Sequence, residues 1–158
     1  MALLVGRFLN KIDKKGRVSI PKPFRDAFQE HGFAGLYAYP SFKYPAVEAC
    51  SEDFMARLGS GVEGLDYFSD EQDDLASIIL ENAHRLAFDP EGRVMLPPEL
   101  LTHTKLTDQA LFVGRGSQFR IWQPAAYDHH RRQAFERARS RGATLRLGPQ
   151  TPLKADER

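Results

Sequence analysis

The feature that most constrains this chain is a motif that occurs twice. Residues 12–21 read IDKKGRVSIP, and residues 88–97, which begin 76 positions later, read FDPEGRVMLP. Both copies contain an acid, two variable residues, Gly, Arg, Val, one further residue, an aliphatic residue and Pro, in that order. Two copies are too few for a solenoid, which stacks at least three repeats. The motif therefore predicts a chain built from two related halves.

In each copy the acid and the glycine satisfy the rules for a tight turn. Asp at the first position and Gly at the fourth are typical of a type I turn, and the carboxylate can accept backbone N–H bonds inside it. Gly supplies the left-handed conformation that a bulge after the turn requires. Pro90 takes the second position, where type I turns favour proline. We therefore expect Asp13, Gly16, Asp89 and Gly92 to be structural residues of two matching turns.

The residues after each turn alternate as a β-strand does. The alternation predicts one face toward the core, formed by Val18, Ile20, Val94 and Leu96. It predicts an opposite face formed by Arg17, Ser19, Arg93 and Met95. Two interpretations of Arg17 and Arg93 are open at this point. They either cover the turns by pairing with the nearby aspartates, or they are presented to a ligand.

The pattern around the motif indicates the same order of elements in both halves: strand, turn, strand, short helix, strand, strand, helix. The helical patterns cover residues 21–32, 51–58, 97–106 and 124–141, with Ser51 as a candidate N-cap. The later β-prone runs cover residues 36–39, 43–50, 110–114 and 119–123. GRGSQ, residues 114–118, is interpreted as a hairpin turn. Each half alone is too small to bury much core, so we expect the two halves to pack together and close one barrel-like core.

The boundaries between the halves follow from composition. Residues 1–58 form the predicted first unit, and residues 59–76 a Gly- and acid-rich linker with the start of a connecting helix. That helix is predicted within residues 73–86. Residues 77–146 form the predicted second unit with its C-terminal helix, and residues 147–158 a flexible tail.

The charge balance conceals strong local differences. Lys and Arg number 22 against 21 Asp and Glu, which gives a formal net charge of +1. The first motif lies in a basic region that contains Arg7, Lys11, Lys14, Lys15, Arg17, Lys22 and Arg25, with Asp13 as the acid. Such a cluster either attracts a polyanion or is only a solvated surface. No run of 18 apolar residues and no secretion signal is found, so we expect a cytoplasmic protein without a membrane partner.

These residues carry a resemblance to a known family. The stretches LNKIDKKGRVSIPKPFRDAF and HRLAFDPEGRVMLPPELL, with RIW at 120–122, resemble the paired motifs of the MraZ family, over roughly residues 5–140. The resemblance implies two tandem AbrB-type swapped-hairpin units that form an α+β, β-rich pseudo-dimer within one chain. It also implies a transcription factor of the bacterial division and cell-wall gene cluster. Such a protein binds tandem G-rich repeats in the promoter of its own operon and assembles into rings on the nucleoid.

Carried over residue by residue, the DNA-contacting arginine of the family falls on Arg17 and Arg93. A two-stranded β-element fits the major groove, and Arg can donate two hydrogen bonds to guanine. The remaining basic residues are expected to contact phosphates, which positions a protein without specifying sequence. They are Lys14, Lys15, Lys11 and Arg7, followed by Lys22 and Arg25.

The second motif departs from the first at the tip of its turn. Pro90 and Glu91 stand where the first motif has Lys14 and Lys15. A carboxylate there repels phosphate, or accepts a hydrogen bond from a cytosine amino group. The second motif is therefore expected either to contact DNA more weakly through Arg93 than the first does through Arg17, or to serve mainly to complete the barrel.

Two other classes of function compete with DNA binding. The histidines lack ligand spacing, and Cys50 is interpreted as a buried small hydrophobe, so we expect no metal, no cofactor, no small-molecule substrate and no enzyme. A protein-interaction or antitoxin-like scaffold is the alternative, with the Arg-rich helix at 124–141 as its surface. Three aromatic residues are either exposed at a subunit interface or packed in the core: Phe42, Tyr44 and Tyr67.

Overall fold

The computed structural model describes residues 3–29 and 32–150, in two compact units that comprise residues 1–127 and 128–158. The first repeat contains β1 (Arg7–Lys11), β2 (Arg17–Ser19), α1 (Lys22–Gln29), β3 (Gly35–Pro40), β4 (Ala46–Cys50) and α2 (Glu52–Glu63). The second contains β5 (His84–Ala87), β6 (Arg93–Met95), α4 (Pro98–Thr104), β7 (Gln109–Gly114), β8 (Phe119–Trp122) and α5 (Pro124–Arg141). Between them lie α3 (Asp70–Leu75) and a π-helix, η1 (Ala76–Leu80). The predicted order of elements is confirmed for both repeats.

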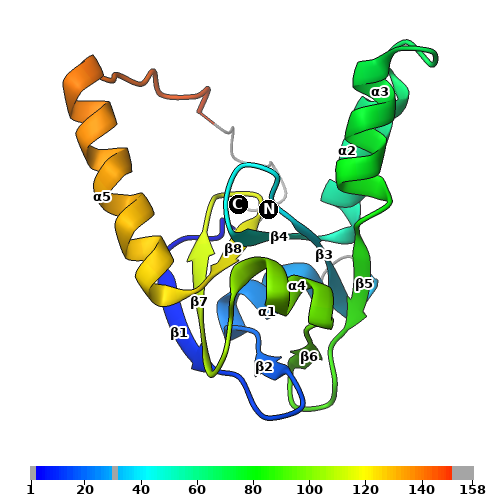
Figure 1. Ribbon diagram of the computed structural model, residues 1–158, viewed down its shortest axis with the longest axis vertical. Helices are drawn as coiled ribbons and strands as arrows, with labels where there is room; N and C mark the ends of the chain where they lie inside the picture. The colour runs from blue at the N-terminus through cyan, green and yellow to red at the C-terminus, as the bar shows by residue number, and fades with distance from the viewer. Residues whose placement is uncertain (1–2, 30–31, 151–158) are drawn as a thin grey trace, which may run out of the picture. The chain divides into compact units, whose positions relative to one another are not determined.

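The strands form two antiparallel sheets in which each repeat pairs with the other. One sheet has six strands in the order β1-β7-β8-β4-β3-β5, and the second consists of β2 and β6 (Figure 1). In the larger sheet β1 pairs with β7 of the second repeat, and β5 pairs in the same way with β3 of the first. The two repeats therefore complete each other's sheet.

The α+β fold class is confirmed, but closure into a single barrel is not. β1 and β5 are the two edges of the six-stranded sheet, and β2 and β6 form a separate sheet that touches the chain after β1 through an isolated bridge between Val18 and Ile12. The ladder does not close because the short β2–β6 ribbon forms its own sheet. Figure 1 places this ribbon at one end of the first unit, with α1 and α4 between it and the larger sheet.

The core of the first unit is drawn from both repeats. Val18, Ile20, Val94 and Leu96 are each 1–2% exposed, as the alternation predicts. In α1, Phe24, Ala27 and Phe28 are buried at helical spacing, and the Phe24 ring lies 5.0 Å from that of Phe119. Leu100 of α4 occupies the corresponding place in the second repeat and is fully buried. Burial of apolar surface shared by both repeats is what holds the unit together.

The segment between the repeats is more helical than its composition indicates. Ser51 caps α2 as predicted, because its side chain accepts a hydrogen bond from the N–H of Phe54 at 3.2 Å. The helix then continues through Gly59 and Gly61 to Glu63, although each glycine costs about 1 kcal/mol relative to Ala. Val62, which is 4% exposed, offsets part of that cost by its burial.

The predicted helix within residues 73–86 is shorter than expected. Helical structure ends at Leu80, and residues 84–87 form β5 because they pair with β3, Ala38 opposite His84. Tertiary pairing here overrides the local helical pattern. The hairpin turn after β7 is as predicted, with Arg115 N–H donating to the carbonyl of Gln118 at 2.8 Å. α5 spans the predicted residues 124–141, whereas residues 151–158 of the predicted tail lie outside the described residues.

Candidate nucleic-acid interface

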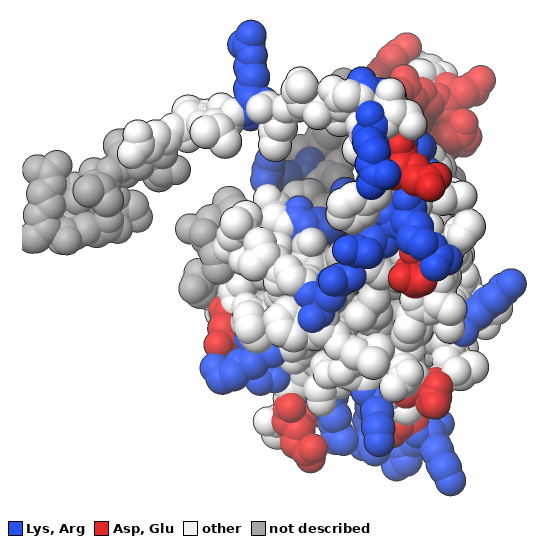
Figure 2. Space-filling model, turned by 90° about the vertical axis from the view of Figure 1, so that its left-hand side faces the viewer, with Lys and Arg blue, Asp and Glu red and all other residues white. Residues whose placement is uncertain are grey.

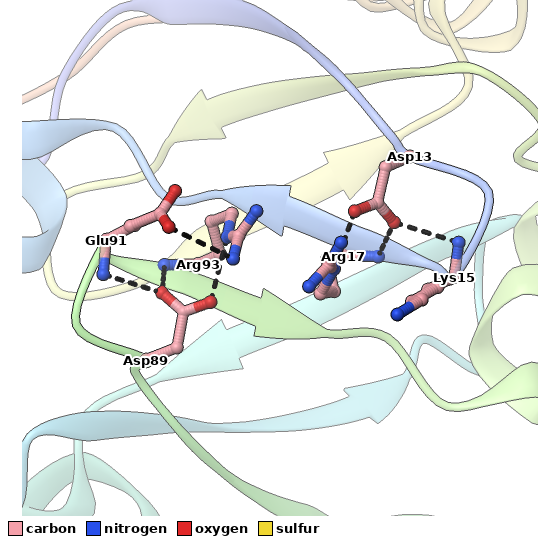
Figure 3. A network of polar contacts seen from close by, with 6 residues as sticks. All are labelled: Asp13, Lys15, Arg17, Asp89, Glu91 and Arg93. Carbon is pink, nitrogen blue, oxygen red and sulfur yellow. Dashed lines mark hydrogen bonds and ion pairs between the residues drawn. The ribbon is translucent and has the colours of Figure 1, made fainter.

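The first turn is organised by the carboxylate of Asp13. Its Oδ1 accepts the backbone N–H groups of Lys15 and Arg17, both at 2.9 Å, and its Oδ2 accepts Nε–H of Arg17 at 2.6 Å (Figure 3). Gly16 closes the turn by donating its N–H to the carbonyl of Asp13 at 3.0 Å, with φ at +85°. An l-residue rarely adopts that conformation, so the glycine is a requirement of the turn.

The second turn reproduces this arrangement almost bond for bond. Oδ1 of Asp89 accepts the N–H groups of Glu91 and Arg93 at 2.9 Å, and Oδ2 accepts Nε–H of Arg93 at 2.8 Å. Gly92 donates to the carbonyl of Asp89 at 2.9 Å, with φ at +76°. DKKG and DPEG therefore build the same turn, in which the corresponding aspartates and glycines make corresponding hydrogen bonds.

The hydrogen bonds hold both aspartates in their charged form. The pKa of Asp13 lies below its usual value, chiefly because the backbone N–H of Arg17 donates to the carboxylate. The pKa of Asp89 is lowered in the same way by the backbone N–H of Arg93. In return, the hydrogen bond to Asp89 raises the pKa of Arg93. Each arginine is thus held beside a carboxylate that remains ionised well into the acidic range.

Pairing with aspartate leaves part of each arginine available to a ligand. Both ion pairs use Nε, and the side chain of Arg17 retains 32% of its exposure. Among residues 3–29 and 32–150, no atom bonds or pairs with the two Nη groups of Arg17. The two interpretations of the arginines are therefore compatible: one side of the guanidinium fixes the turn, and its far end can bind.

Arg93 differs from Arg17 in one contact. Its Nη2 lies 3.6 Å from Oε1 of Glu91, and Glu91 occupies the position in the second turn that Lys15 occupies in the first. Its side chain is also less exposed, at 25%. The glutamate thus competes with any ligand for the free end of Arg93.

The two arginines share one face of the β2–β6 ribbon. Arg17 lies opposite Met95, Val18 opposite Val94, and Ser19 opposite Arg93. The valines are buried, which places the other four side chains on the outward face. The predicted alternation is confirmed, and the exchange of strands brings both arginines onto one small surface. The sequence gives no signal that β2 pairs with β6, since their separation along the chain is large.

The basic residues of the first repeat are not equally placed. Lys14 and Lys15 are exposed at the tip of the turn, and Lys11 is exposed at the end of β1 next to it. Arg7 lies at the other end of β1, roughly 13 Å away at 3.3 Å per strand residue. There its guanidinium lies 5.9 Å from the ring of Tyr127. Arg7 is therefore the predicted contact residue most remote from the turn.

Two residues of α1 also have partners within the protein. Lys22 pairs with Asp26 at 2.7 Å on the surface of the helix. The guanidinium of Arg25 lies directly over Gly92 of the second turn, where it would collide with a side chain at that position. At the matching place in the second repeat, Leu101 lies over Gly16 of the first turn. Sequence reasoning treated Arg25 only as part of the first basic cluster and missed that it covers the other repeat's turn.

The surface of this end of the unit is mixed in charge. The lower end of Figure 2 corresponds to the end that carries the two turns in Figure 1. Lys and Arg side chains gather there, with acidic side chains among them. Such a surface has local cations at the tips rather than a broad positive field.

Other chemistries receive less support from the described residues. No three His, Cys, Asp or Glu side chains within residues 3–29 and 32–150 are grouped to hold a metal ion. Cys50 is 2% exposed, and burial raises the pKa of its thiol to about 12, with a further contribution from Glu48. His84 pairs with Glu99 at 3.1 Å. In the same part of the chain, no helix combines the length and the apolar character that a membrane span needs.

The candidate interface aromatics divide into two groups. Phe42 and Tyr67 are 67% and 77% exposed. Tyr44 instead packs against Trp122, with ring centroids 5.7 Å apart. Tyr44 is therefore a half-buried packing residue, whereas Phe42 and Tyr67 are exposed.

Fold and site together define an α+β protein whose two repeats exchange strands and present two ordered arginines on one ribbon. Comparison with known proteins identifies its family. A family model described as "MraZ protein, putative antitoxin-like" matches residues 79–146. The chain is 40% identical to Transcriptional regulator MraZ of Pelagibacter ubique (strain HTCC1062), over 91% of this chain and 93% of that protein. It is also 40% identical to the protein of that name from Rickettsia bellii (strain OSU 85-389), over 92% and 98%. For Gluconacetobacter diazotrophicus the identity is 42%, over 92% of each chain.

The chain belongs to the MraZ family. The similarity spans more than nine-tenths of this chain and of each of these relatives.

Proposed function

We propose that this protein is a transcriptional regulator that binds double-stranded DNA through the outward face of the β2–β6 ribbon. The observation that carries the proposal is the pair of arginines on that face, each fixed by the aspartate of its own turn. The name of these relatives, Transcriptional regulator MraZ, supports the same function.

The geometry suits recognition of guanine. A two-stranded β-ribbon fits the major groove, where guanine presents O6 and N7 as a pair of acceptors. Arg17 can donate its two Nη groups to that pair while Nε remains bonded to Asp13. Because the aspartate already restricts the side chain, less rotamer entropy is lost when the arginine binds. Arg93 is held in the same way, but Glu91 competes with a base for its Nη2.

Lysines at the first turn supply contacts of a different kind. Lys14 and Lys15 are exposed beside Arg17, and Lys11 lies at the adjoining end of β1. Contacts between lysine and phosphate fix position and add affinity, but they carry no sequence information. Arg7, further along β1, would contact phosphate only where the duplex extends beyond the turn.

The finer details of the proposal follow the family resemblance. The DNA sites are tandem G-rich repeats in the promoter of the protein's own operon, within the division and cell-wall gene cluster. The protein acts in the cytoplasm on the nucleoid as a homo-oligomeric ring, which presents many ribbons to successive repeats. It acts without a cofactor or a small-molecule substrate and is not an enzyme. Footprinting on DNA upstream of its own gene tests the sites, and light scattering of the purified protein tests the ring.

The decisive experiment compares three arginine variants in a gel shift with the footprinted promoter fragment. Arg17→Ala should abolish specific binding, and Arg93→Ala should weaken it less. Arg115→Ala is the matched control, because this exposed arginine lies in the β7–β8 turn. Next to that turn, Val113 of β7 pairs with Arg7, which lies at the end of β1 remote from the ribbon. The control position is therefore also remote from the ribbon. A folded Arg17→Ala protein with unchanged affinity would refute the proposal.

A change at the lysines should be distinguishable from a change at the arginines. Lys14→Ala should weaken binding to all duplexes alike and reduce the slope of log affinity against log salt by about 1. An unchanged slope would show that Lys14 does not contact phosphate.

A scaffold function is the second candidate, favoured by the second unit. There Arg131, Arg132, Phe135, Glu136 and Arg139 of α5 line one shallow surface pocket, and Arg132 also pairs with Asp128 at 3.0 Å. Phe135 is 55% exposed, and its ring lies 4.9 Å from the guanidinium of Arg131. The arginines exceed the acids on this surface, which suits an acidic protein partner. Affinity purification from a nuclease-treated lysate tests this function. A stoichiometric partner that is lost in Arg131→Ala/Arg132→Ala, while Arg17→Ala retains it, would support the scaffold.

A further inference from the structure

The outward face of the ribbon carries an exposed methionine beside the first arginine. Met95 is 56% exposed, although methionine is usually buried, and it lies directly opposite Arg17. The N–H of Leu96 donates to the carbonyl of Gly16 at 2.9 Å, which makes Arg17 and Met95 a non-hydrogen-bonded pair. Side chains of such pairs approach each other more closely than those of the alternate pairs. Arg17 and Met95 are therefore cross-strand neighbours on one face.

The second arginine has a different neighbour. Arg93 lies opposite Ser19, which occupies the place in the first repeat that Met95 occupies in the second. The face thus consists of two unequal pairs, Arg17 with Met95 and Arg93 with Ser19. Isolated exposed apolar residues are common on protein surfaces. The position of Met95 gives it significance, because any duplex bound by Arg17 also meets the methionine.

The major groove offers one apolar group to such a side chain. Thymine carries a C5-methyl at its groove edge, whereas cytosine carries only hydrogen at the same carbon. Cross-strand side chains are about 5 Å apart at Cβ, and successive bases rise about 3.4 Å. A residue beside Arg17 therefore reaches the base one or two positions from the guanine that Arg17 binds. Serine can bond to several bases, so Ser19 gives no equivalent selection.

We propose that Met95 is a specificity-determining residue that selects a thymine near the guanine bound by Arg17, through contact with the C5-methyl group. This inference rests on the proposed function. Removing one buried methyl group should lower affinity about fourfold, which is the transfer free energy of such a group expressed as an equilibrium constant.

The test uses the full chain and duplexes that it selects from a random library. Each thymine of the selected site is replaced in turn by deoxyuridine, which lacks only the C5-methyl. One replacement near the guanine bound by Arg17 should weaken wild-type binding about fourfold. Met95→Ser should bind the thymine and deoxyuridine duplexes equally, whereas Met95→Leu should retain the difference. Met95→Gln, which keeps the length of the side chain, should lose it.

A converse variant tests the assignment from the other repeat. Ser19→Met should create a second thymine-sensitive position near the guanine bound by Arg93. When the thymine that Met95 contacts is replaced by cytosine, wild-type binding should weaken. A 5-methylcytosine at the same place should then recover part of the affinity for wild type but not for Met95→Ser.

The outcomes separate this inference from the proposed function. If Arg17→Ala abolishes binding but no deoxyuridine replacement affects the wild type, the role of Met95 is wrong and DNA binding stands. If a deoxyuridine effect persists unchanged in both Met95→Ser and Met95→Gln, another residue reads the methyl group. If the wild type selects no duplex, both proposals fail.

Discussion

The two turns share their framework but differ at the tip and in what covers them. Asp, Gly and Arg make the same set of bonds in both, within 0.2 Å for the Nε–Oδ2 contacts of 2.6 and 2.8 Å. The first tip exposes Lys14 and Lys15, whereas the second has Pro90 and Glu91. Leu101 lies over the first glycine and Arg25 over the second. The difference shows which parts of the motif the turn requires and which parts are free to vary.

The side chain that lies over each turn glycine comes from the other repeat. Arg25 belongs to the first repeat but lies over the turn of the second, so a cation returns to the turn that lacks lysines. Its guanidinium is also 3.4 Å from the carbonyl of Ile20. The two turns are therefore equal in backbone structure and unequal in charge.

The largest effects are expected in the shared core. Phe24→Ala should lower the free energy of unfolding by about 3–5 kcal/mol, and Leu100→Ala, its counterpart, by about 2–5 kcal/mol. Both side chains are at most 1% exposed. Urea denaturation should show one cooperative transition shifted by either variant. Leu9→Ala is the control, since Leu9 is 51% exposed. Separate transitions for the two repeats would contradict a common core.

The glycines should come next. Gly16→Ala and Gly92→Ala should each cost about 1–2 kcal/mol, because both residues have positive φ. A side chain at position 92 must also displace Arg25, whereas at position 16 it meets the Leu96 carbonyl oxygen at 3.4 Å. A double-mutant cycle of Gly92→Ala with Arg25→Ala should therefore show coupling, and one of Gly16→Ala with Arg25→Ala should not. Gly61→Ala, in an open helical position, should be neutral or stabilising.

A charge exchange at the tips of the two turns should give a smaller effect, which is on DNA binding and not on stability. Glu91→Lys adds a cation and removes the ion pair at 3.6 Å from Arg93 Nη2. It should steepen the slope of log affinity against log salt by about 0.9, and Lys15→Glu should reduce it. Lys43→Glu, in the exposed loop before β4, should leave the slope unchanged. If Glu91→Lys has no effect on the slope, the second turn does not approach phosphate.

The smallest expected effect is a dependence of stability on pH. Because the pKa values of Asp13 and Asp89 are lowered in the folded protein, their charged forms stabilise it above the unfolded pKa of about 3.9. That contribution should be lost as the pH falls through the lower folded values. Asp13→Asn and Asp89→Asn should each flatten the fall in urea midpoint below pH 4, by similar amounts. Asp74→Asn, on α3, controls for loss of a surface charge. If the urea midpoint falls equally steeply below pH 4 in wild type and in Asp13→Asn, the assigned role of the carboxylate is contradicted.

The sequence predicted the elements near the motif well, because local rules set them. The turn requires Asp at its first position and Gly at its fourth, and alternation fixes which side of β2 is buried. The N-cap at Ser51 and the extent of α5 also follow from local patterns. Predictions were less successful between the repeats, where burial of Val62 carries a helix through two glycines and pairing with β3 ends another before His84.

The sequence by itself thus determined the two turns, the buried valines and the presence of one arginine after each glycine. Only the tertiary structure decided that both arginines share a face, since β2 and β6 meet through pairing between distant segments. The same pairing set Met95 opposite Arg17, and the packing of α1 placed Arg25 over Gly92. Local backbone preferences are short-ranged, whereas strand partners are chosen by the burial of a whole core.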